Sequence, residues 1–175
     1  MTLVLGGGRN GKSTYAQTMV ESSRQLALFV ATAIAGNDEI AARIAAHRAS
    51  RPAHWLTLEA PLQVGDAIRM GDVTPWVLVD CITLLTSNIL LSCPEPIQES
   101  NFRGKLKQEI GHLTTGYHDH PGNWVIVSNE VELGLVPLYP LGRYYRDRLG
   151  WANQKLAQIS DRVIFMIADF PMIVK

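Results

Sequence analysis

Short apolar runs alternate with longer amphipathic stretches along the chain, which is the pattern of βαβ units around a parallel sheet. The apolar runs are mostly continuous, so the strands are expected to be buried on both faces of the sheet. Proline and glycine clusters separate the elements. The pattern therefore predicts an α/β fold with strands at Thr2–Leu5, Leu26–Ala31, Trp76–Asp80, Trp124–Ser128 and Arg162–Ile167, and with helices at Lys12–Ser23, Asp38–Ala49, Thr83–Leu91, Glu99–Thr115 and Gly142–Ile159.

The composition is that of a globular domain. Hydrophobic residues make up 47% and charged residues 18% of the 175 residues, a balance that fills a core, and this length predicts a single domain over residues 1–175. Sixteen Lys and Arg residues against sixteen Asp and Glu residues give a net charge of zero, so no overall field attracts nucleic acid or anionic lipid. Any phosphate group that the chain binds must therefore be held locally.

We expect neither a membrane span nor an export signal. The longest nearly apolar run, residues 26–35, has ten residues, about half of what a bilayer requires, and the N-terminal segment lacks the features of a signal peptide. Cys81 and Cys93 are spaced neither as a redox pair nor as part of a zinc site, so buried thiols in a reducing compartment are expected. The protein is therefore predicted to be cytoplasmic.

The first predicted strand leads into a phosphate-binding loop. The segment Gly6-Gly7-Gly8-Arg9-Asn10-Gly11-Lys12-Ser13 matches G-x-x-x-x-G-K-[ST] between a predicted strand and a predicted helix, the context that the motif requires. Its glycines let backbone N–H groups point at phosphate oxygens, and the helix adds the positive end of its dipole. Lys12 is expected to contact the β- and γ-phosphates, and Ser13 to bind the Mg²⁺ that bridges them. The strand and helix argue against a mere glycine-rich turn with an accidental lysine.

Two carboxylates follow predicted strands. Asp80 closes an apolar strand and should lie beside the phosphate loop, as a second ligand on the Mg²⁺ side. Its alternative role is to cap the helix that begins near Thr83. Asn129 and Glu130 follow the next strand in the same way; Glu130 could orient water, metal or an acceptor hydroxyl, or serve only as a helix cap or loop ion pair.

A basic stretch covers the end of the second predicted helix and the residues after it. His47 comes seven residues after one isoleucine and three after another, so helical periodicity places it on the apolar side, where most histidines are packed. Arg48, Arg51 and His54 follow closely, as a site for a polyanion would require. A solvated helix end explains this stretch equally well from the residues alone.

Two further groups are predicted to be structural. The segment His118-Asp119-His120 contains metal-ligating side chains, but it precedes a Pro-Gly pair without a third ligand at useful spacing, so a surface loop is favoured. Arg143, Arg146 and Arg148 recur along the last predicted helix. They are expected on a solvated face or in a subunit contact rather than on phosphate.

Taken together, the motifs resemble the bifunctional adenosylcobinamide kinase/adenosylcobinamide-phosphate guanylyltransferase family of cobalamin biosynthesis, nearly from end to end. Besides the phosphate loop, the resemblance rests on Ala31-Thr32-Ala33 with Asp38-Glu39, the stretch Arg43-Ile44-Ala45-Ala46-His47-Arg48-Ala49-Ser50-Arg51-Pro52-Ala53-His54-Trp55, Glu59, Val79-Asp80-Cys81, Asn129-Glu130-Val131, Gly134-Leu135-Val136-Pro137, Arg146-Asp147, Gly150 and Asn153-Gln154-Lys155-Leu156-Ala157. The His-Arg-x-x-Arg-Pro-x-x-Trp stretch is far more specific than a phosphate loop alone.

This resemblance implies a RecA-like P-loop NTPase fold with a mostly parallel sheet, a homotrimer and two reactions on one corrinoid. Adenosylcobinamide is phosphorylated by ATP or GTP, and GTP then delivers GMP to adenosylcobinamide phosphate through a guanylylated histidine, which is His47 here. The phosphate-loop motif and the strand-end position described above make Lys12 the second catalytic residue and Ser13 and Asp80 the expected Mg²⁺ ligands. The implied nucleotide contacts are Gly6, Gly7, Gly8, Arg9, Asn10, Gly11, Lys12, Ser13, Ala31, Thr32, Ala33, Arg48, Ala49, Ser50, Arg51, Glu59 and Asp80.

The chain departs from the usual family pattern at two places. Glu132 stands where glycine is usual, and Asp169-Phe170-Pro171 replaces a glycine-containing turn. Neither departure is expected to touch the phosphate loop or His47, so acceptor binding or kinase efficiency is expected to be more affected than nucleotide chemistry. The alternatives are a small-metabolite P-loop kinase in which His47 is a spectator, and a GTP-dependent switch; against the switch, the chain contains no Asn-Lys-x-Asp motif.

Overall fold

The structure is a computed structural model of the chain, and it describes residues 1–34, 48–49 and 51–175. Within these residues, seven strands form one sheet in the order β3-β2-β4-β5-β1-β6-β7. All neighbouring pairs are parallel except β6 and β7, which are antiparallel. The strands are β1 Thr2–Gly6, β2 Ala27–Ala31, β3 Leu56–Glu59, β4 Trp76–Asp80, β5 Asn123–Val127, β6 Arg162–Ile167 and β7 Phe170–Ile173.

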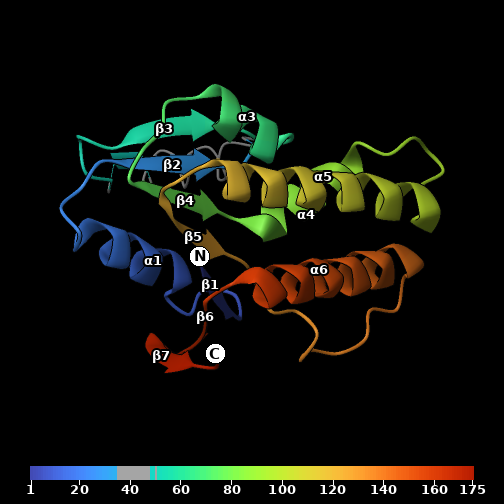
Figure 1. Cartoon of the computed structure of the whole chain (residues 1–175). Helices are drawn as coiled ribbons and strands as arrows, with labels where there is room; N and C mark the ends of the chain where they lie inside the picture. The colour runs from blue at the N-terminus through green and yellow to red at the C-terminus, as the bar shows by residue number, and fades with distance from the viewer. Residues whose placement is uncertain (35–47, 50) are drawn as a thin grey trace.

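Helices cover both faces of this sheet (Figure 1). One face packs on α3 to α6 and the other on α1, because successive side chains of a buried strand point to opposite faces: Leu3 contributes to the first core and Val4 to the second. Among the described residues, no helix is long and apolar enough to span a bilayer. The helices are α1 Lys12–Glu21, α3 Val64–Met70, α4 Ile82–Leu91, α5 Glu99–Asp119 and α6 Pro140–Ile159.

The register brings the carboxyl ends of the parallel strands to one edge of the sheet. Ala31 pairs with Glu59 on one side and with Asp80 on the other, and Asp80 pairs with Val127. Gly6 at the end of β1 pairs with Met166 in β6. Ligands of such sheets bind outside this edge, where the phosphate loop begins.

The prediction of an α/β P-loop fold with a mostly parallel sheet is confirmed, and the predicted strands agree with the structure within one residue at each end. The helix expected at Asp38–Ala49 lies largely outside the described residues; its last two residues, Arg48 and Ala49, are helical. The sequence did not reveal β3, α3 and β7. These elements have four, seven and four residues, too few for a periodic signal, and β7 contains a proline, which edge strands tolerate. The single domain stays a prediction.

Candidate functional site

The phosphate loop has a backbone that only glycine accommodates at two positions. Gly6 and Gly11 have φ values of 148° and 81°, which side-chain-bearing residues rarely adopt. A Cβ on Gly6 would lie 2.6 Å from the carbonyl oxygen of Met166. The loop ends where α1 begins at Lys12, so the amino end of this helix faces the space in which a phosphate would bind.

The side chain of Lys12 lies inside the phosphate loop. This side chain is buried, and its ammonium group donates hydrogen bonds to the carbonyl oxygen of Gly7 at 2.5 Å and to Oδ1 of Asn10 at 3.2 Å. The Asn10 amide in turn donates to the carbonyl oxygen of Met166 at 2.5 Å, which ties the loop to β6. Burial lowers the pKa of Lys12, while the charges of Cys81 and Asp80 oppose that shift.

Asp80 lies between the phosphate loop and the basic stretch. Its charge acts on the pKa of both Lys12 and Arg51, so the carboxylate is close to both cations. The capping alternative does not hold, because α4 begins at Ile82 with Cys81 as its N-cap. A hydroxyl from Ser13 and a carboxylate from Asp80 are the hard oxygen donors that Mg²⁺ prefers beside phosphate oxygens. The residues present at this edge therefore fit the metal.

The described part of the basic stretch reaches the same edge from the β2–β3 side. Arg48 forms an ion pair with Glu59 at 3.2 Å. The Arg51 guanidinium carbon lies 3.6 Å from the ring centroid of Phe29, a cation–π contact, and Nη1 of Arg51 donates to the Thr57 hydroxyl at 3.4 Å. Burial lowers the pKa of Arg51 and the Asp80 charge raises it. His47 and Ser50 lie outside the described residues.

Thr32 joins the ends of β2 and β4. Its fully buried hydroxyl donates to the carbonyl oxygen of Cys81 and accepts from the Cys81 N–H, both at 2.8 Å. Its N–H donates to the Asp80 carbonyl oxygen at 3.2 Å, and Asn88 donates to its carbonyl oxygen at 2.8 Å. The side chain thus holds the strand that carries Asp80 in register, while the nucleotide contacts expected at Ala31, Thr32 and Ala33 stay predictions.

Glu130 connects the phosphate loop with the segment after β5. Its N–H donates to the carbonyl oxygen of Gly6 at 2.9 Å, and its carboxylate accepts from the N–H of Glu132 at 2.5 Å. The preceding Asn129 donates its N–H to the Thr83 hydroxyl at 2.7 Å. The Glu130 carboxylate therefore stabilises its own loop beside the phosphate site.

Asp169 contacts the phosphate loop, so the expectation that it does not is wrong. A Cβ on Gly11 would lie only 1.8 Å from Oδ1 of Asp169, which means that the carboxylate occupies the space beside this glycine. The contact arises because Ala168 and Asp169 both adopt left-handed backbone, with φ values of 48° and 68°, in the tight turn from β6 to β7. The sequence could not reveal it, because β7 was not predicted.

Glu132, the other departure from the usual family pattern, lies away from the phosphate loop. The Glu132 carboxylate packs on α6, where a Cβ on Gly150 would lie 2.0 Å from Oε1 of Glu132. Sequence reasoning also missed the surroundings of Cys81: burial and the Asp80 charge raise the pKa of its thiol to about 11, and the Tyr145 hydroxyl donates to the Thr83 carbonyl oxygen nearby at 3.0 Å. In the sequence, the position of Cys81 directly after Asp80 was the signal that could have revealed these surroundings.

The segment His118-Asp119-His120 is placed differently from the expectation. His118 and Asp119 belong to the last turn of α5 rather than to a loop, and His120 is buried; across the described residues no three His, Cys, Asp or Glu side chains are grouped to hold a metal. Arg143 and Arg146 are half-buried and donate hydrogen bonds to backbone carbonyl oxygens of the segment before α6, and the expected solvated face or subunit contact stays a prediction.

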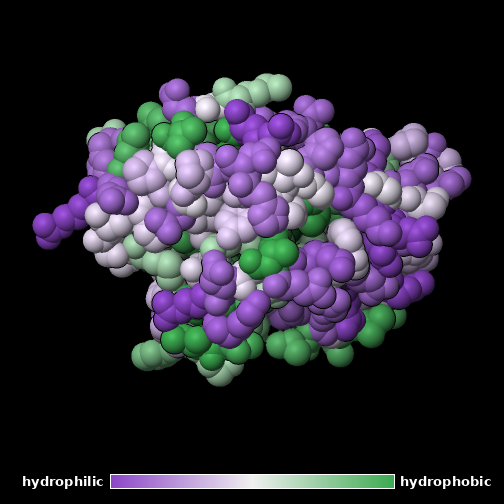
Figure 2. Space-filling model, viewed as in Figure 1, coloured by the Kyte–Doolittle hydropathy of each residue, from purple (hydrophilic) through white to green (hydrophobic). Residues whose placement is uncertain are grey.

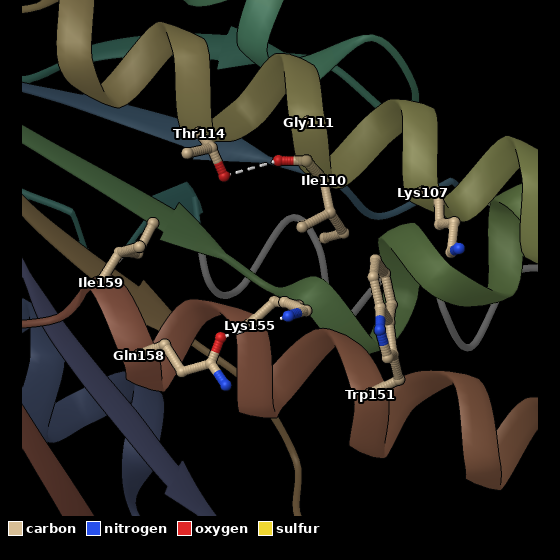
Figure 3. A pocket seen from close by; sticks show the side chains of 8 residues that line it. All are labelled: Lys107, Ile110, Gly111, Thr114, Trp151, Lys155, Gln158 and Ile159. Carbon is tan, nitrogen blue, oxygen red and sulfur yellow. Dashed lines mark hydrogen bonds between the residues drawn. The ribbon is translucent and has the colours of Figure 1, made fainter.

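A cavity of about 430 Å³ opens between α5 and α6, away from the predicted site residues (Figure 3). Two polar groups on its wall are partnered within their own helices: the Thr114 hydroxyl donates to the Ile110 carbonyl oxygen at 2.8 Å, and Lys155 donates to Gln158 at 3.3 Å. None of the residues of the phosphate loop lines this cavity.

Comparisons with known proteins agree with this geometry. A family model described as "Cobinamide kinase / cobinamide phosphate guanyltransferase" matches residues 2–174. The "Bifunctional adenosylcobalamin biosynthesis protein CobP" of Pseudomonas aeruginosa is 42% identical over 174 residues, which are 99% of this chain and 96% of that protein. The corresponding CobU protein of Salmonella typhimurium is 35% identical over 182 residues, covering 100% of this chain and 99% of that one.

Among solved structures, the RadB recombinase aligns with 94% of this chain and 72% of its own, at 13% identity and a TM-score of 0.47. The family assignment rests instead on the sequence match, which runs through the phosphate loop, the basic stretch and the strand-end residues alike. The chain therefore belongs to the cobinamide kinase/cobinamide phosphate guanyltransferase family.

Proposed function

We propose that this chain phosphorylates adenosylcobinamide with ATP or GTP and then transfers GMP from GTP to adenosylcobinamide phosphate, giving adenosylcobinamide-GDP and pyrophosphate. As a member of its family the chain is a transferase. The observation that supports the proposal most is the phosphate loop between β1 and α1 with Asp80 close to Lys12, in a chain matched along its length by bifunctional enzymes. We place both reactions in the cytoplasm and in a homotrimer.

In the kinase step, the loop holds the triphosphate and the acceptor hydroxyl attacks the γ-phosphorus. Lys12 is already buried beside the loop carbonyls, and it would turn its ammonium group to the β- and γ-phosphates, where negative charge builds up. Ser13 and Asp80 would hold Mg²⁺, which would neutralise phosphate charge. The reaction then depends on position and charge rather than on a covalent intermediate.

In the guanylyl step, we propose that His47 attacks the α-phosphorus of GTP. Pyrophosphate leaves from the loop, and GMP stays on the imidazole until the acceptor phosphate displaces it. His47 directly precedes Arg48 in the chain, and Arg48 and Arg51 reach the edge that carries Asp80 and Glu59. An imidazole with a pKa near the ordinary value of about 6.5 is mostly neutral at pH 7 and thus nucleophilic.

A kinase with His47 as a spectator and a GTP-dependent switch are not favoured, since the curated relatives are named as bifunctional biosynthesis proteins. The proposal is tested by Lys12→Ala, with Lys155→Ala as a matched surface control. We expect the first change to lower both cobinamide phosphorylation and GTP–pyrophosphate exchange by at least about a hundredfold, because both transfers use the same cation. Wild-type rates in either assay would contradict a shared phosphate site.

A further inference from the structure

The side chain of Asn10 lies inside the phosphate loop, between Lys12 and β6. Its amide nitrogen donates to the carbonyl oxygen of Met166 at 2.5 Å, and its Oδ1 accepts from the Lys12 ammonium group at 3.2 Å. The same amide packs on the loop backbone, because a Cβ on Gly6 would lie 2.8 Å from its nitrogen and 3.2 Å from its oxygen. Asn10 therefore joins Lys12 and the loop backbone to a neighbouring strand.

The strand that holds the other end of this connection is fixed. Met166 is 1% exposed, and it pairs with Gly6 in β1 on one side and with Pro171 in β7 on the other. Figure 2 shows hydrophobic side chains on the surface at the lower left of the molecule, where Figure 1 places β7. Phe170 and Ile173 of that strand are 77% and 60% exposed. The exposed edge strand is thus β7, and the Met166 carbonyl oxygen belongs to an inner strand.

An amide is suited to this position because it carries a donor and an acceptor on one rigid group. The Met166 carbonyl oxygen requires the donor and the Lys12 ammonium group requires the acceptor, so only one orientation of the Asn10 amide satisfies both. A carboxylate would repel the carbonyl oxygen, and an aliphatic side chain would bond to neither partner. The backbone fixes the side chain further, since Arg9 and Gly11 on either side have left-handed φ values of 59° and 81°.

The ammonium group of Lys12 is held at two of its three donors. Besides the bond to Asn10, it donates to the carbonyl oxygen of Gly7 at 2.5 Å. A lysine ammonium group has three N–H donors, so one remains for a phosphate oxygen while the other two fix its place. A lysine side chain is long and flexible, and holding it in one position before the ligand binds reduces the entropy that binding must remove.

We infer that Asn10 is a positioning residue, which acts through Lys12 and keeps its ammonium group directed at the β- and γ-phosphates. The inference rests on the proposed function for the two transfers that Lys12 serves. This role differs from the nucleotide contact that the family resemblance implies for Asn10, because both hydrogen bonds of the amide are made to the protein itself.

The test is a double-mutant cycle of Asn10→Ala and Lys12→Ala, with Asn101→Ala at an exposed position of α5 as the control. Single-turnover phosphorylation of cobinamide by magnesium ATP should slow at least about tenfold in Asn10→Ala, because Lys12 loses a charge-assisted hydrogen bond that orients it. The same change made in the Lys12→Ala protein should alter the rate less than about twofold, since Asn10 then has no ammonium group to orient. The control should keep the wild-type rate.

A second cycle on the same four proteins measures binding alone and requires no corrinoid. Isothermal titration of magnesium pyrophosphate should give a Kd at least about threefold higher for Asn10→Ala than for the wild-type protein, and the same change should have almost no effect in the Lys12→Ala background. Equal effects of Asn10→Ala in both backgrounds would overturn the inference, because they would reflect general damage to the loop. A wild-type rate and Kd in Asn10→Ala would overturn it as well. Failure of the wild-type protein to phosphorylate cobinamide would instead contradict the proposed function, and the binding cycle would still test the coupling.

Discussion

Replacing Asp169 by Asn should tighten the binding of phosphate ligands, because this carboxylate lies against Gly11 of the phosphate loop. A phosphate group held by the Gly11 amide would lie about 7 Å from the carboxylate. At that distance two unit charges repel each other by about 1 kcal/mol at an effective dielectric constant of roughly 50. Loss of the charge should therefore lower the Kd for magnesium pyrophosphate about fivefold.

The amide is a close match for the carboxylate in shape, and Asn tolerates the left-handed backbone of the turn as well as Asp does. Isothermal titration of pyrophosphate at low ionic strength measures the effect, and 0.5 M salt should reduce it by screening. Asp72→Asn is the control, since it removes the same charge from an exposed position just before β4. Equal affinity of the wild-type protein and Asp169→Asn at low salt, or weaker binding by the variant at an unchanged melting temperature, would refute this reasoning.

Three other predictions concern buried groups. Thr32→Val should lower the free energy of unfolding by about 2 to 3 kcal/mol in urea titrations, because the buried N–H and carbonyl group of Cys81 lose their partner. A loss below about 0.5 kcal/mol would argue against a stabilising role of these two hydrogen bonds. Burial lowers the pKa of His120, which accepts from the Thr74 N–H. The unfolded chain then binds the proton more readily, so stability should fall as the pH drops below about 6.5; His120→Asn should flatten this slope, and an equal slope in that variant would count against it. The Cys81 thiol, with a pKa raised to about 11, should resist iodoacetamide at pH 8 in peptide mapping, and rapid alkylation there would contradict it.

The sequence was sufficient for the parts of the fold that repeat a strong local signal. Continuous apolar runs identified the five long parallel strands, and the glycine–lysine motif located the loop at the end of β1. Strand order and register follow from long-range pairing, which no local pattern contains. The short edge strands β3 and β7 were not predicted, because four residues are too few for a periodic signal.

The site shows the same division. Lys12 was expected from the phosphate-loop motif, Asp80 from its strand-end position and Arg51 from the family resemblance, and the structure brings the three residues to one edge of the sheet. The contact between Asp169 and Gly11 joins two residues that lie near opposite ends of the sequence, and it depends on a turn with left-handed backbone. No motif with a fixed residue spacing could therefore reveal it. The backbone carbonyl partners of Arg143 and Arg146 were likewise not predicted. Hydrogen bonds of that kind leave no trace in side-chain composition.

The most direct test of the account is the covalent labelling of His47. After incubation with Mg²⁺ and GTP labelled at the α-phosphate, we predict about one GMP per active chain, attached to His47 through a bond that is labile in acid and stable in base. GTP labelled at the γ-phosphate should leave no label, and His47→Ala should lose the label yet still phosphorylate cobinamide. Label mapped by peptide mass to a different residue, or full labelling of His47→Ala, would contradict the account.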